Sequence, residues 1–493
     1  MDGQGVSWAK QTLGQVLASR RGDAEALVTV NGRFSYQQLS EKAKRAAGAL
    51  QSLGICRDDH VGILMGNDEY WLSLFYGAAL IGAVTVPVNT RFKTAEIDFC
   101  LKQADCKLLF YVERFPNIDF GSMVRDTGFG NAFEISRGLP AGKFAPSEIS
   151  PYDILLIQFT SGTTAYPKGV MLTHDNMLRN AWAAGTRVGI RAEDRYFNCR
   201  PFFHVAGTTL SALMSLAFGA CLVTLPTFEA GAALEMMERE RCTLISGNDT
   251  LFQMLMGHAD FPRRKLSLRG GWAAAGPETM RAIIDRMGCK TICAAYGLSE
   301  ASPNVVMSDW RDPEELRVQG LAKPHEGIDL RIVDGEIQLR GWSVMRGYCN
   351  NPEATAKAFT ADGWLRTGDL GSLTADGRLR MTGRLKDVFR VGGENVAPAE
   401  VEEVLLAHPA VQTAQVIGVP DPRLGEVPCA YVTLKSAATE EELLEWCKGR
   451  CANFRVPRYL KIVADFESIG MTASGKVQKT KLREHALREF RLG

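Results

Sequence analysis

Short apolar runs alternate with helix-like segments through most of this 493-residue chain. Runs such as "HVGILMG" (60–66), "CKLLFYV" (106–112) and "ACLVTLP" (220–226) have the length and composition of buried strands. Strands that alternate with helices build layered α/β folds rather than helical bundles. Because a single core rarely grows beyond about 300 residues, the length also predicts two or three domains.

The longest uncharged stretch, "YWLSLFYGAALIGAVTVPV" (70–88), raises the question of a membrane span. Two glycines and a proline interrupt it, and its end is rich in β-branched residues. These features favour a buried helix that ends near Leu80, followed by a buried strand over residues 83–88. The sequence therefore predicts no transmembrane segment.

The C-terminal part of the chain has a pattern of its own. Pro398 precedes a helix-like segment, two strand-like runs follow, and Thr439 with Glu442 forms a capping box that opens another helix. Charges and glycines replace the apolar pattern just before this part. We therefore expect an α/β fold with a large multi-layer N-terminal domain, residues 1–385, and a small α+β C-terminal domain, residues 386–493.

Composition argues against several classes of partner. The formal net charge is +1 and neither sign forms a long run, which speaks against a nucleic-acid partner. The twelve cysteines include no CxxC pair and no histidines spaced to complete a zinc site, so we interpret them as reduced and mostly buried. The first residues lack a signal-peptide pattern. These features predict a cytoplasmic protein and give no indication of its oligomeric state.

The ten residues "TSGTTAYPKG" (160–169) are the most informative stretch of the chain. Apolar runs at 154–159 and 169–174 flank them, so the loop is expected to project between two buried strands. Gly162 lets backbone amides turn toward an anion, the hydroxyl side chains add donors, and Lys168 adds a positive charge. The lysine is not followed by Ser or Thr, as a Walker loop requires. The stretch predicts a phosphate-binding loop of another kind.

Further motifs follow the loop in a fixed order. They are "PFFHVAG" (201–207), "YGLSE" (296–300), "GWLRTGDL" (363–370), "GRLKDVFRVGGENVAP" (383–398) and "TASGKVQK" (472–479). The whole set resembles the signature of the adenylate-forming superfamily, which includes acyl-CoA synthetases, firefly luciferase and the adenylation domains of peptide synthetases. The resemblance covers nearly the whole chain. Two positions depart from it, because Ala165 replaces a usual glycine and Ser299 a usual threonine.

The resemblance implies a two-step reaction with ATP, Mg²⁺ and coenzyme A. A carboxylic acid and ATP give an acyl-adenylate and pyrophosphate, and coenzyme A then gives the thioester and AMP. Such a site needs cations and aimed donors, because several anionic oxygens meet there. By resemblance, the residues that contact ATP are Thr160, Ser161, Gly162, Thr163, Thr164, Lys168, Gly276, Tyr296, Ser299, Asp369, Arg384 and Lys476.

The resemblance also assigns individual roles. Lys476, His204 and Thr164 are the catalytic residues, with Lys476 at the α-phosphate and His204 at the carboxylate of the acid. Glu300 and Thr160 are the residues expected to hold Mg²⁺. In physical terms, Tyr296 offers a flat face for adenine, and the carboxylate of Asp369 can accept both ribose hydroxyls beside Arg384.

The acid pocket and the hinge complete the expected site. The pocket residues are expected to be His204, Val205, Thr208, Asn248 and Ala295. Val205 follows the histidine in a run without acidic residues, so an α-amine would be buried without a carboxylate partner. We expect a fatty or aromatic acid that lacks an amine. The resemblance places the hinge at Lys386, where the mobile C-terminal domain rotates between the two half-reactions.

Three alternatives to an acid–CoA ligase remain at this point. The first is a stand-alone adenylation enzyme that loads a carrier protein; Val205 stands where peptide-synthetase domains usually have Asp, and no carrier domain is expected to follow. The second is a luciferase-like oxygenase. The third is a catalytically idle nucleotide-binding protein, which would be expected to lack Lys476 or Glu300, whereas both are present.

Overall fold

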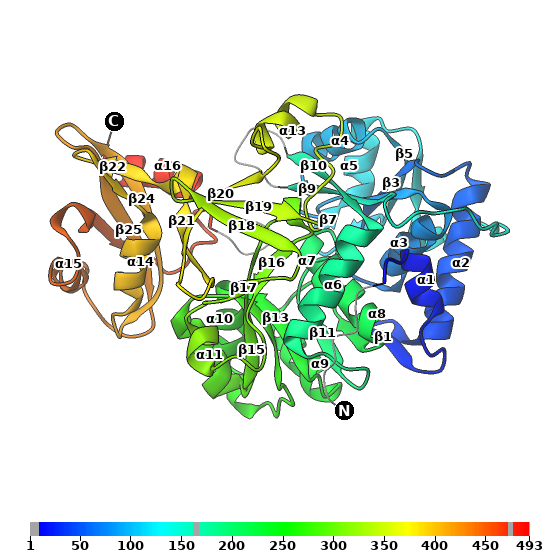
Figure 1. The fold of residues 1–493 in the computed structure, drawn as a ribbon, viewed down its shortest axis with the longest axis horizontal. Helices are drawn as coiled ribbons and strands as arrows, with labels where there is room; N and C mark the ends of the chain where they lie inside the picture. The colour runs from blue at the N-terminus through cyan, green and yellow to red at the C-terminus, as the bar shows by residue number, and fades with distance from the viewer. Residues whose placement is uncertain (1–8, 161–166, 472–476, 493) are drawn as a thin grey trace. The chain divides into compact units, whose positions relative to one another are not determined.

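The computed structural model describes residues 9–160, 167–471 and 477–492. The chain, drawn as a ribbon in Figure 1, divides into two compact units. Each unit has its own hydrophobic core. Unit 1 comprises Met1–Asp329 and Leu339–Leu365, and unit 2 comprises Leu330–Gln338 and Arg366–Gly493. A large mixed α/β unit followed by a smaller one is the predicted fold class, which is thus confirmed.

A nine-stranded sheet forms the centre of unit 1. Its strands, in spatial order, are β17 (Lys323–Pro324), β16 (Asn304–Met307), β15 (Thr291–Gly297), β14 (Gly270–Ala274), β13 (Leu244–Asn248), β11 (Arg195–Asn198), β12 (Cys221–Thr224), β1 (Glu25–Thr29) and β2 (Gly32–Ser35). The strands from β15 to β1 are parallel, and antiparallel strands close both edges. The carboxyl ends of the parallel strands therefore share one edge, where α/β sheets usually bind ligands.

Alternate residues of these strands face two different layers of helices. Phe197, Ile245, Ala273 and Ile292 belong to a core shared with α9 (Ala230–Arg239), α10 (Asp249–Gly257) and α11 (Pro277–Met287). On the other face the sheet packs against α6 (His174–Val188) and the π-helix η2 (Thr208–Leu213). The short helix α8 (Met214–Phe218) continues η2. A strand covered on both faces explains the continuous apolar runs in the sequence.

A second, six-stranded sheet in unit 1 carries the predicted phosphate loop. Its order is β10 (Lys168–Thr173), β9 (Ile154–Thr160), β4 (Val84–Pro87), β3 (His60–Leu64), β5 (Cys106–Tyr111) and β8 (Ala132–Glu134). Helices α2 (Tyr36–Ser52), α3 (Glu69–Ile81), α4 (Thr94–Gln103) and α5 (Phe120–Thr127) accompany it. The strands expected at 60–66, 106–112 and 220–226 are confirmed as β3, β5 and β12.

The long uncharged stretch is a buried helix and a buried strand, as predicted. Helix α3 ends at Ile81, Gly82 caps it with a φ of 75°, and β4 begins at Val84. A Cβ atom at Gly77 would lie 2.8 Å from the Cβ of Ala46 in α2, so this glycine lets the two helices approach closely. Within the described ranges, no helix combines the length and apolar character needed to cross a membrane.

Smaller elements complete unit 1. They are α1 (Leu13–Ala18), β6 (Arg114–Phe115), β7 (Ile118–Asp119), η1 (Ile135–Arg137), α7 (Val205–Gly207), η3 (Phe261–Arg263), η4 (Ser299–Ala301), α12 (Glu314–Val318) and α13 (Pro352–Ala358). Helix α6 begins after Thr173, whose hydroxyl accepts the N–H of Asn176.

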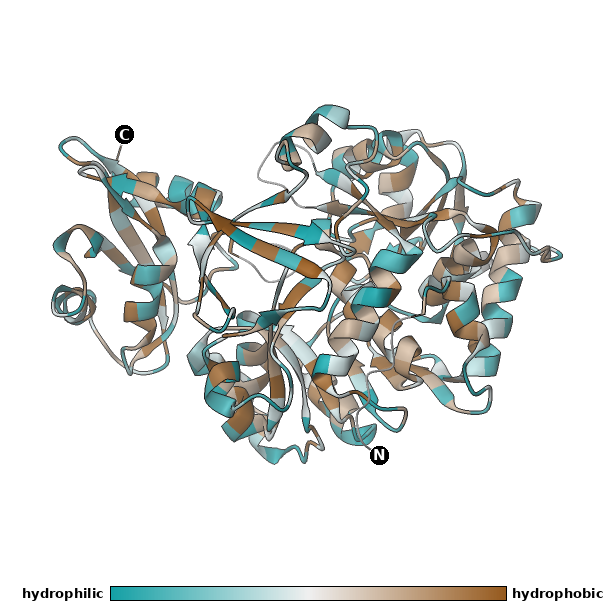
Figure 2. Cartoon of the chain, viewed as in Figure 1, coloured by the Kyte–Doolittle hydropathy of each residue, from teal (hydrophilic) through white to brown (hydrophobic). Residues whose placement is uncertain are grey.

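Unit 2 is built around two sheets whose strands are mostly antiparallel. The chain passes between the units within β18 (Ile328–Val333) and β19 (Glu336–Gly341), which form a four-stranded sheet with β20 (Leu365–Leu373) and β21 (Leu379–Arg384). Figure 2 shows hydrophobic and hydrophilic residues alternating along these strands. The short helix η5 (Leu385–Asp387) follows β21.

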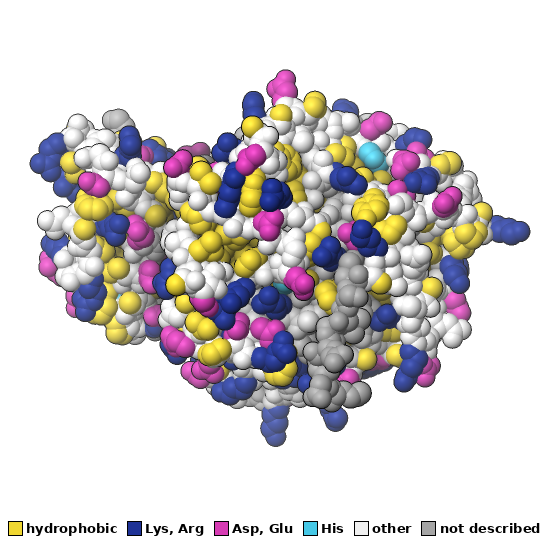
Figure 3. Space-filling model, in the orientation of Figure 1, with side chains coloured by type: hydrophobic (Ala, Val, Ile, Leu, Met, Phe, Trp, Pro, Cys, Tyr) yellow, Lys and Arg dark blue, Asp and Glu magenta, His cyan; other side chains and the backbone are white. Residues whose placement is uncertain are grey.

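The second sheet of unit 2 packs against helices. Its strands are β22 (Phe389–Val391), β23 (Glu394–Val396), β24 (Val411–Asp421), β25 (Gly425–Leu434) and β26 (Tyr459–Ile462). Its helices are α14 (Pro398–Leu406), α15 (Glu440–Lys448), η6 (Asn453–Arg455) and α16 (Lys479–Glu489). The helix starts predicted at Pro398 and Thr439 are confirmed. On the face drawn in Figure 3, basic and acidic side chains are interspersed.

Candidate active site

The predicted phosphate loop connects the two strands of a hairpin in unit 1. Strands β9 and β10 are antiparallel, and Thr160 pairs with Lys168 at the last described position before the loop. The hydroxyl of Thr160 donates to the carbonyl oxygen of Lys168 over 3.4 Å. The predicted strand–loop–strand arrangement is thus confirmed. Ser161, Gly162, Thr163 and Thr164, predicted to contact ATP, lie outside the described residues, as does Ala165.

Residues 345–349 lie along the outer edge of β10. The N–H of Cys349 donates to the carbonyl oxygen of Gly169 over 2.7 Å, and the N–H of Met171 donates to that of Gly347 over 3.0 Å. An isolated antiparallel β-bridge between Val170 and Tyr348 continues this pairing. A segment from late in unit 1 thereby borders the strand that carries Lys168.

Tyr348 connects two of the predicted ATP-site residues. The Nζ atom of Lys168 lies 5.0 Å from the centre of the Tyr348 ring, a cation–π distance. The hydroxyl of Tyr348 donates to Oε1 of Glu300 over 2.9 Å. Burial and then the charge of Glu300 raise the pKa of Tyr348, so the phenol stays protonated and remains a donor. The structure therefore brings Lys168 to the ring and Glu300 to the hydroxyl of one buried tyrosine.

Glu300 has the geometry of a carboxylate held for a ligand. It lies in η4 directly after β15, and the N–H of Met345 donates to its backbone carbonyl over 2.8 Å. Among the described residues, only Tyr348 hydrogen-bonds to its carboxylate. No group of three or more His, Cys, Asp or Glu in the described ranges is placed to hold a metal ion. One carboxylate with phosphate oxygens is, however, a usual Mg²⁺ arrangement, so Glu300 fits the predicted ion.

Several predicted residues meet at the carboxyl edge of the nine-stranded sheet. Asn248 ends β13 and pairs with Ala274 at the end of β14. Gly276 follows β14 and caps α11, and Ala295 and Tyr296 lie at the end of β15. Each of these residues is at least partly exposed to solvent. Adjacent parallel strands thus place the predicted pocket and adenine residues side by side.

Two buried side chains, Asn304 and His325, hold the backbone of β15 at Tyr296 through hydrogen bonds. The amide nitrogen of Asn304 donates to the carbonyl oxygens of Tyr296 and Val306 over 3.0 and 3.1 Å. Its amide oxygen contacts Nε2 of His325. Burial, and secondarily the charge of Arg187, lowers the pKa of His325 to about 3. His325 is therefore neutral, and it contacts the amide of Asn304 that holds the end of β15.

His204 begins helix α7 in a defined orientation. Its Nδ1 atom accepts the N–H of Ala206 over 3.1 Å, so the neutral ring carries its proton on Nε2. Val205 and Thr208, also predicted for the pocket, are completely buried. The hydroxyl of Thr208 donates to the carbonyl oxygen of Val205 over 3.2 Å and keeps its lone pairs as acceptors.

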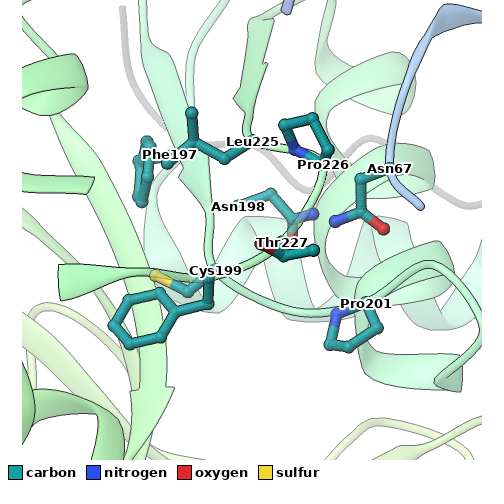
Figure 4. A pocket seen from close by; sticks show the side chains of 9 residues that line it. Asn67, Phe197, Asn198, Cys199, Pro201, Leu225, Pro226 and Thr227 are labelled. Atoms are coloured by element: carbon teal, nitrogen blue, oxygen red, sulfur yellow. The ribbon is translucent and has the colours of Figure 1, made fainter. Parts of the chain in front are cut away.

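Two asparagines fix the chain before His204. The amide nitrogens of Asn67 and Asn198 both donate to the carbonyl oxygen of Arg200 over 2.8 Å, and Oδ1 of Asn67 accepts the N–H of Phe202 over 2.7 Å. Figure 4 shows these asparagines at a small cavity between the ends of β11 and β12. Its volume of about 30 Å³ suits one water molecule and not an acid substrate.

In unit 2, Asp369 and Arg384 face each other across two strands. They are paired in the register of β20 and β21, and the Nε atom of Arg384 lies 3.1 Å from Oδ1 of Asp369. The side chain of Asp369 is buried, and that of Arg384 is partly exposed. The two residues that the resemblance assigns to the ribose are therefore neighbours, as that assignment requires.

The turn before Asp369 is held by a buried glutamate. Oε1 of Glu336 accepts the N–H of Gly368 over 3.1 Å, and the hydroxyl of Thr367 accepts the N–H of Asp369 over 3.0 Å. The same hydroxyl donates to the carbonyl oxygen of Ile337 over 2.6 Å. Gly368 has a φ of 67°, a conformation that favours glycine. These contacts fix the direction of the Asp369 carboxylate.

Of the two lysines predicted for the site in unit 2, the structure describes Lys386. Lys386 lies in η5 with an exposed side chain, yet local desolvation of its ammonium group and then the charge of Arg384 lower its pKa. Lys476, the predicted catalytic lysine, lies outside the described residues.

Tyr348, Asn67, Asn198 and Glu336 were not predicted from the sequence. Tyr348, Asn67 and Glu336 each form a hydrogen bond to a residue far away in the sequence. Asn198 bonds to the backbone of the loop that follows its strand. No local spacing distinguishes such a residue from an ordinary loop or strand residue. Only the pairing of 345–349 with β10 reveals Tyr348.

A sequence profile of AMP-binding enzymes matches residues 15–349, and a profile of the C-terminal domain of AMP-binding enzymes matches residues 400–476. The chain belongs to the AMP-binding enzyme family. The predicted superfamily is thus confirmed, and membership makes the chain an adenylate-forming, AMP-forming ligase.

Relatives of similar length support this membership. The chain is 35% identical to YngI of Bacillus subtilis, provisionally named an acyl-CoA synthetase, with 98% of both chains covered. It is 33% identical to the mitochondrial medium-chain acyl-CoA ligase ACSF2 of Mus musculus, covering 98% of this chain and 88% of the relative. The crystal structure of the anthranilate CoA ligase AuaEII with anthranoyl-AMP matches with a TM-score of 0.89 and 26% identity over 98% of both chains.

Proposed function

We propose that this AMP-binding enzyme is an acid–CoA ligase. It activates a fatty or aromatic carboxylic acid with ATP to an acyl-adenylate, and then forms the acyl-CoA thioester with release of AMP. The observation that carries the proposal is the contact of Tyr348 with both Lys168 and Glu300, directly beside the β9–β10 loop. This contact brings a cation and a carboxylate close together, and these are the groups that bind phosphate and Mg²⁺, so it supports the proposal.

The residues of unit 1 have distinct tasks in this proposal. The β9–β10 loop and Lys168 bind the phosphates, and Thr160 and Glu300 hold Mg²⁺, which neutralises phosphate charge when bound. Tyr296 and Gly276 face the adenine, and Ser299 contacts the α-phosphate. His204 donates its Nε2 proton to the carboxylate of the acid and orients it, in a pocket with Val205, Thr208, Asn248 and Ala295.

Unit 2 supplies the nucleoside contacts and the change between half-reactions. Asp369 and Arg384 bind the ribose hydroxyls, and Lys476 reaches the α-phosphate during adenylation. We propose that Lys386 is the hinge, that the mobile domain begins there after residue 385, and that its rotation removes Lys476 before coenzyme A attacks. We also propose that the enzyme acts in the cytoplasm in fatty-acid metabolism.

An ATP–pyrophosphate exchange assay tests the first half-reaction. Exchange should require Mg²⁺ and depend on a carboxylic acid, tested with short, medium, long-chain and aromatic acids and with phenylalanine. Absence of exchange with every acid would refute the ligase function. In the second half, coenzyme A and a phosphopantetheinylated carrier protein are compared as acceptors of the acyl group. Turnover with the carrier alone would favour the carrier-loading alternative.

A further inference from the structure

Arg200 is a buried arginine that forms no ion pair with the residues that the structure describes. It directly precedes the segment that leads to His204, and only 9% of its surface is exposed. Its guanidinium lies 5.1 Å from the ring centre of Trp272, and among the described residues it makes no side-chain hydrogen bond or ion pair. Leaving a buried charge unpaired costs several kcal/mol, so the feature calls for an explanation.

The surroundings of Arg200 are rich in unsatisfied hydrogen-bond donors. The buried Nε of Arg200 and Nε1 of Trp272 have no hydrogen-bond partner among the described residues. The hydroxyls of Tyr196, Ser211 and Ser246 lie close together in the same surroundings. Guanidinium and indole nitrogens can only donate, and hydroxyls can donate as well. Such a group of donors matches an anion that accepts several hydrogen bonds.

The position of these residues relates them to the acid pocket. Ser246 and Trp272 are register partners on β13 and β14 and face away from the core that contains Ile245 and Ala273. They therefore lie on the same face as Asn248 and Ala274, which follow two residues later along each strand. At about 3.3 Å per residue, the donors lie some 7 Å behind the residues expected to contact the acid. An acid that enters past Asn248 would point its far end at them.

We infer that the acid substrate carries a second carboxylate at the end away from the activated one, and that Arg200 binds this carboxylate beside Trp272. The inference rests on the proposed function and narrows its substrate class to a dicarboxylic acid. It agrees with the absence of an acidic residue next to His204, which excludes an α-amine and not a second anion. A guanidinium and a carboxylate form a paired, charge-assisted contact that a monocarboxylic acid cannot make.

Pyrophosphate exchange with matched acids tests the inference on the wild-type enzyme. The dicarboxylic acids from succinate to sebacate are compared with the monocarboxylic acids of equal chain length, and terephthalate with benzoate. The methyl monoester of the best diacid serves as a neutral analogue of the same shape. We expect kcat/KM for the best diacid to exceed that for its monoacid and its monoester by on the order of 10²-fold, as for sites built around a buried polar partner.

Variants assign that preference to Arg200. Arg200→Leu should lower kcat/KM for the diacid by on the order of 10²-fold and leave or raise the value for the monoacid. Trp272→Phe, which keeps the ring and removes the N–H, should reduce the preference by a smaller factor. Arg179→Leu is the matched control, because Arg179 also lies over a tryptophan, Trp342, at 4.6 Å, and neither residue is assigned to the site. It should keep the wild-type preference.

The outcomes separate the inference from the function on which it rests. Efficient exchange with monoacids and monoesters, with diacids equal or worse, would overturn the inference and leave the ligase function intact. The inference would also be overturned if Arg200→Leu and Trp272→Phe both retained a wild-type diacid preference. Exchange with no acid of either series would refute the ligase function, and the inference with it.

Discussion

Acidification should destabilise unit 1 through two buried histidines. His174 and His325 are 1% and 3% exposed, and burial lowers the pKa of His174 to about 4 and, together with Arg187, that of His325 to about 3. Nδ1 of His174 accepts the N–H of Leu13 over 3.1 Å, so protonation there would place two donors against each other. Both side chains must stay neutral in the folded protein.

The magnitude follows from proton linkage. In the unfolded chain both histidines titrate near a pKa of about 6.5, so below that pH the unfolded state binds more protons than the folded state. The two histidines therefore cause no loss of stability above about pH 6.5. The free energy of unfolding falls as the pH drops from there toward the folded-state pKa values. At pH 5 each histidine lies about 1.5 pH units below its unfolded pKa, which corresponds to a loss of about 2 kcal/mol. Two separate sites add to about 4 kcal/mol, a large share of a typical folding free energy.

Urea unfolding followed by tryptophan fluorescence measures this loss, because every tryptophan except Trp446 lies in the ranges of unit 1. The wild type is compared with a His174→Asn, His325→Gln double variant, whose amides mimic the bonded ring nitrogens without titrating. The cost of the substitutions themselves is measured at pH 7.5. Between pH 7.5 and 5.0 the wild type should lose about 4 kcal/mol more unfolding free energy than the double variant. Parallel pH curves for the two proteins would refute the reasoning.

Three further predictions concern catalysis. Tyr348→Phe removes the donor to Glu300 and should lower kcat/KM for ATP in pyrophosphate exchange by about tenfold, as expected for a hydrogen bond to a charged group; an unchanged ATP dependence would contradict its role. Lys476→Ala should lower adenylation by on the order of 10²-fold, while thioester formation from pre-formed acyl-AMP stays near normal. Equal losses in both half-reactions would argue against domain rotation. Lys386→Pro fixes φ and should preserve exchange but reduce thioester formation; two unaffected half-reactions would exclude Lys386 as the hinge.

The sequence was sufficient for the elements whose signal is local. Apolar runs bounded by glycine or proline predicted β3, β5 and β12, and the change to β-branched residues after Gly82 separated α3 from β4. Strand order was not accessible in this way. The pairing of β11 with both β12 and β13 depends on contacts across the chain that no period in the sequence records.

The candidate site shows the same division. Motif order led to Lys168, Glu300, Asp369 and His204, because their segments are distinctive. It did not lead to Arg200, which looks like an ordinary residue before "PFFHVAG" and gains meaning only from its burial against Trp272. Side chains that act through distant partners become visible only when the fold places the partners.

The pairing of residues 345–349 with β10 has a practical consequence for dissecting the protein. β10 is the outermost strand of its sheet, and an uncovered outer strand is a template for aggregation. A fragment that stops at residue 329, where the first continuous stretch of unit 1 ends, would expose that strand and lose Tyr348. The AMP-binding enzyme profile ends at residue 349, just after this pairing. A truncated N-terminal fragment meant to stay monomeric in solution should therefore extend at least that far.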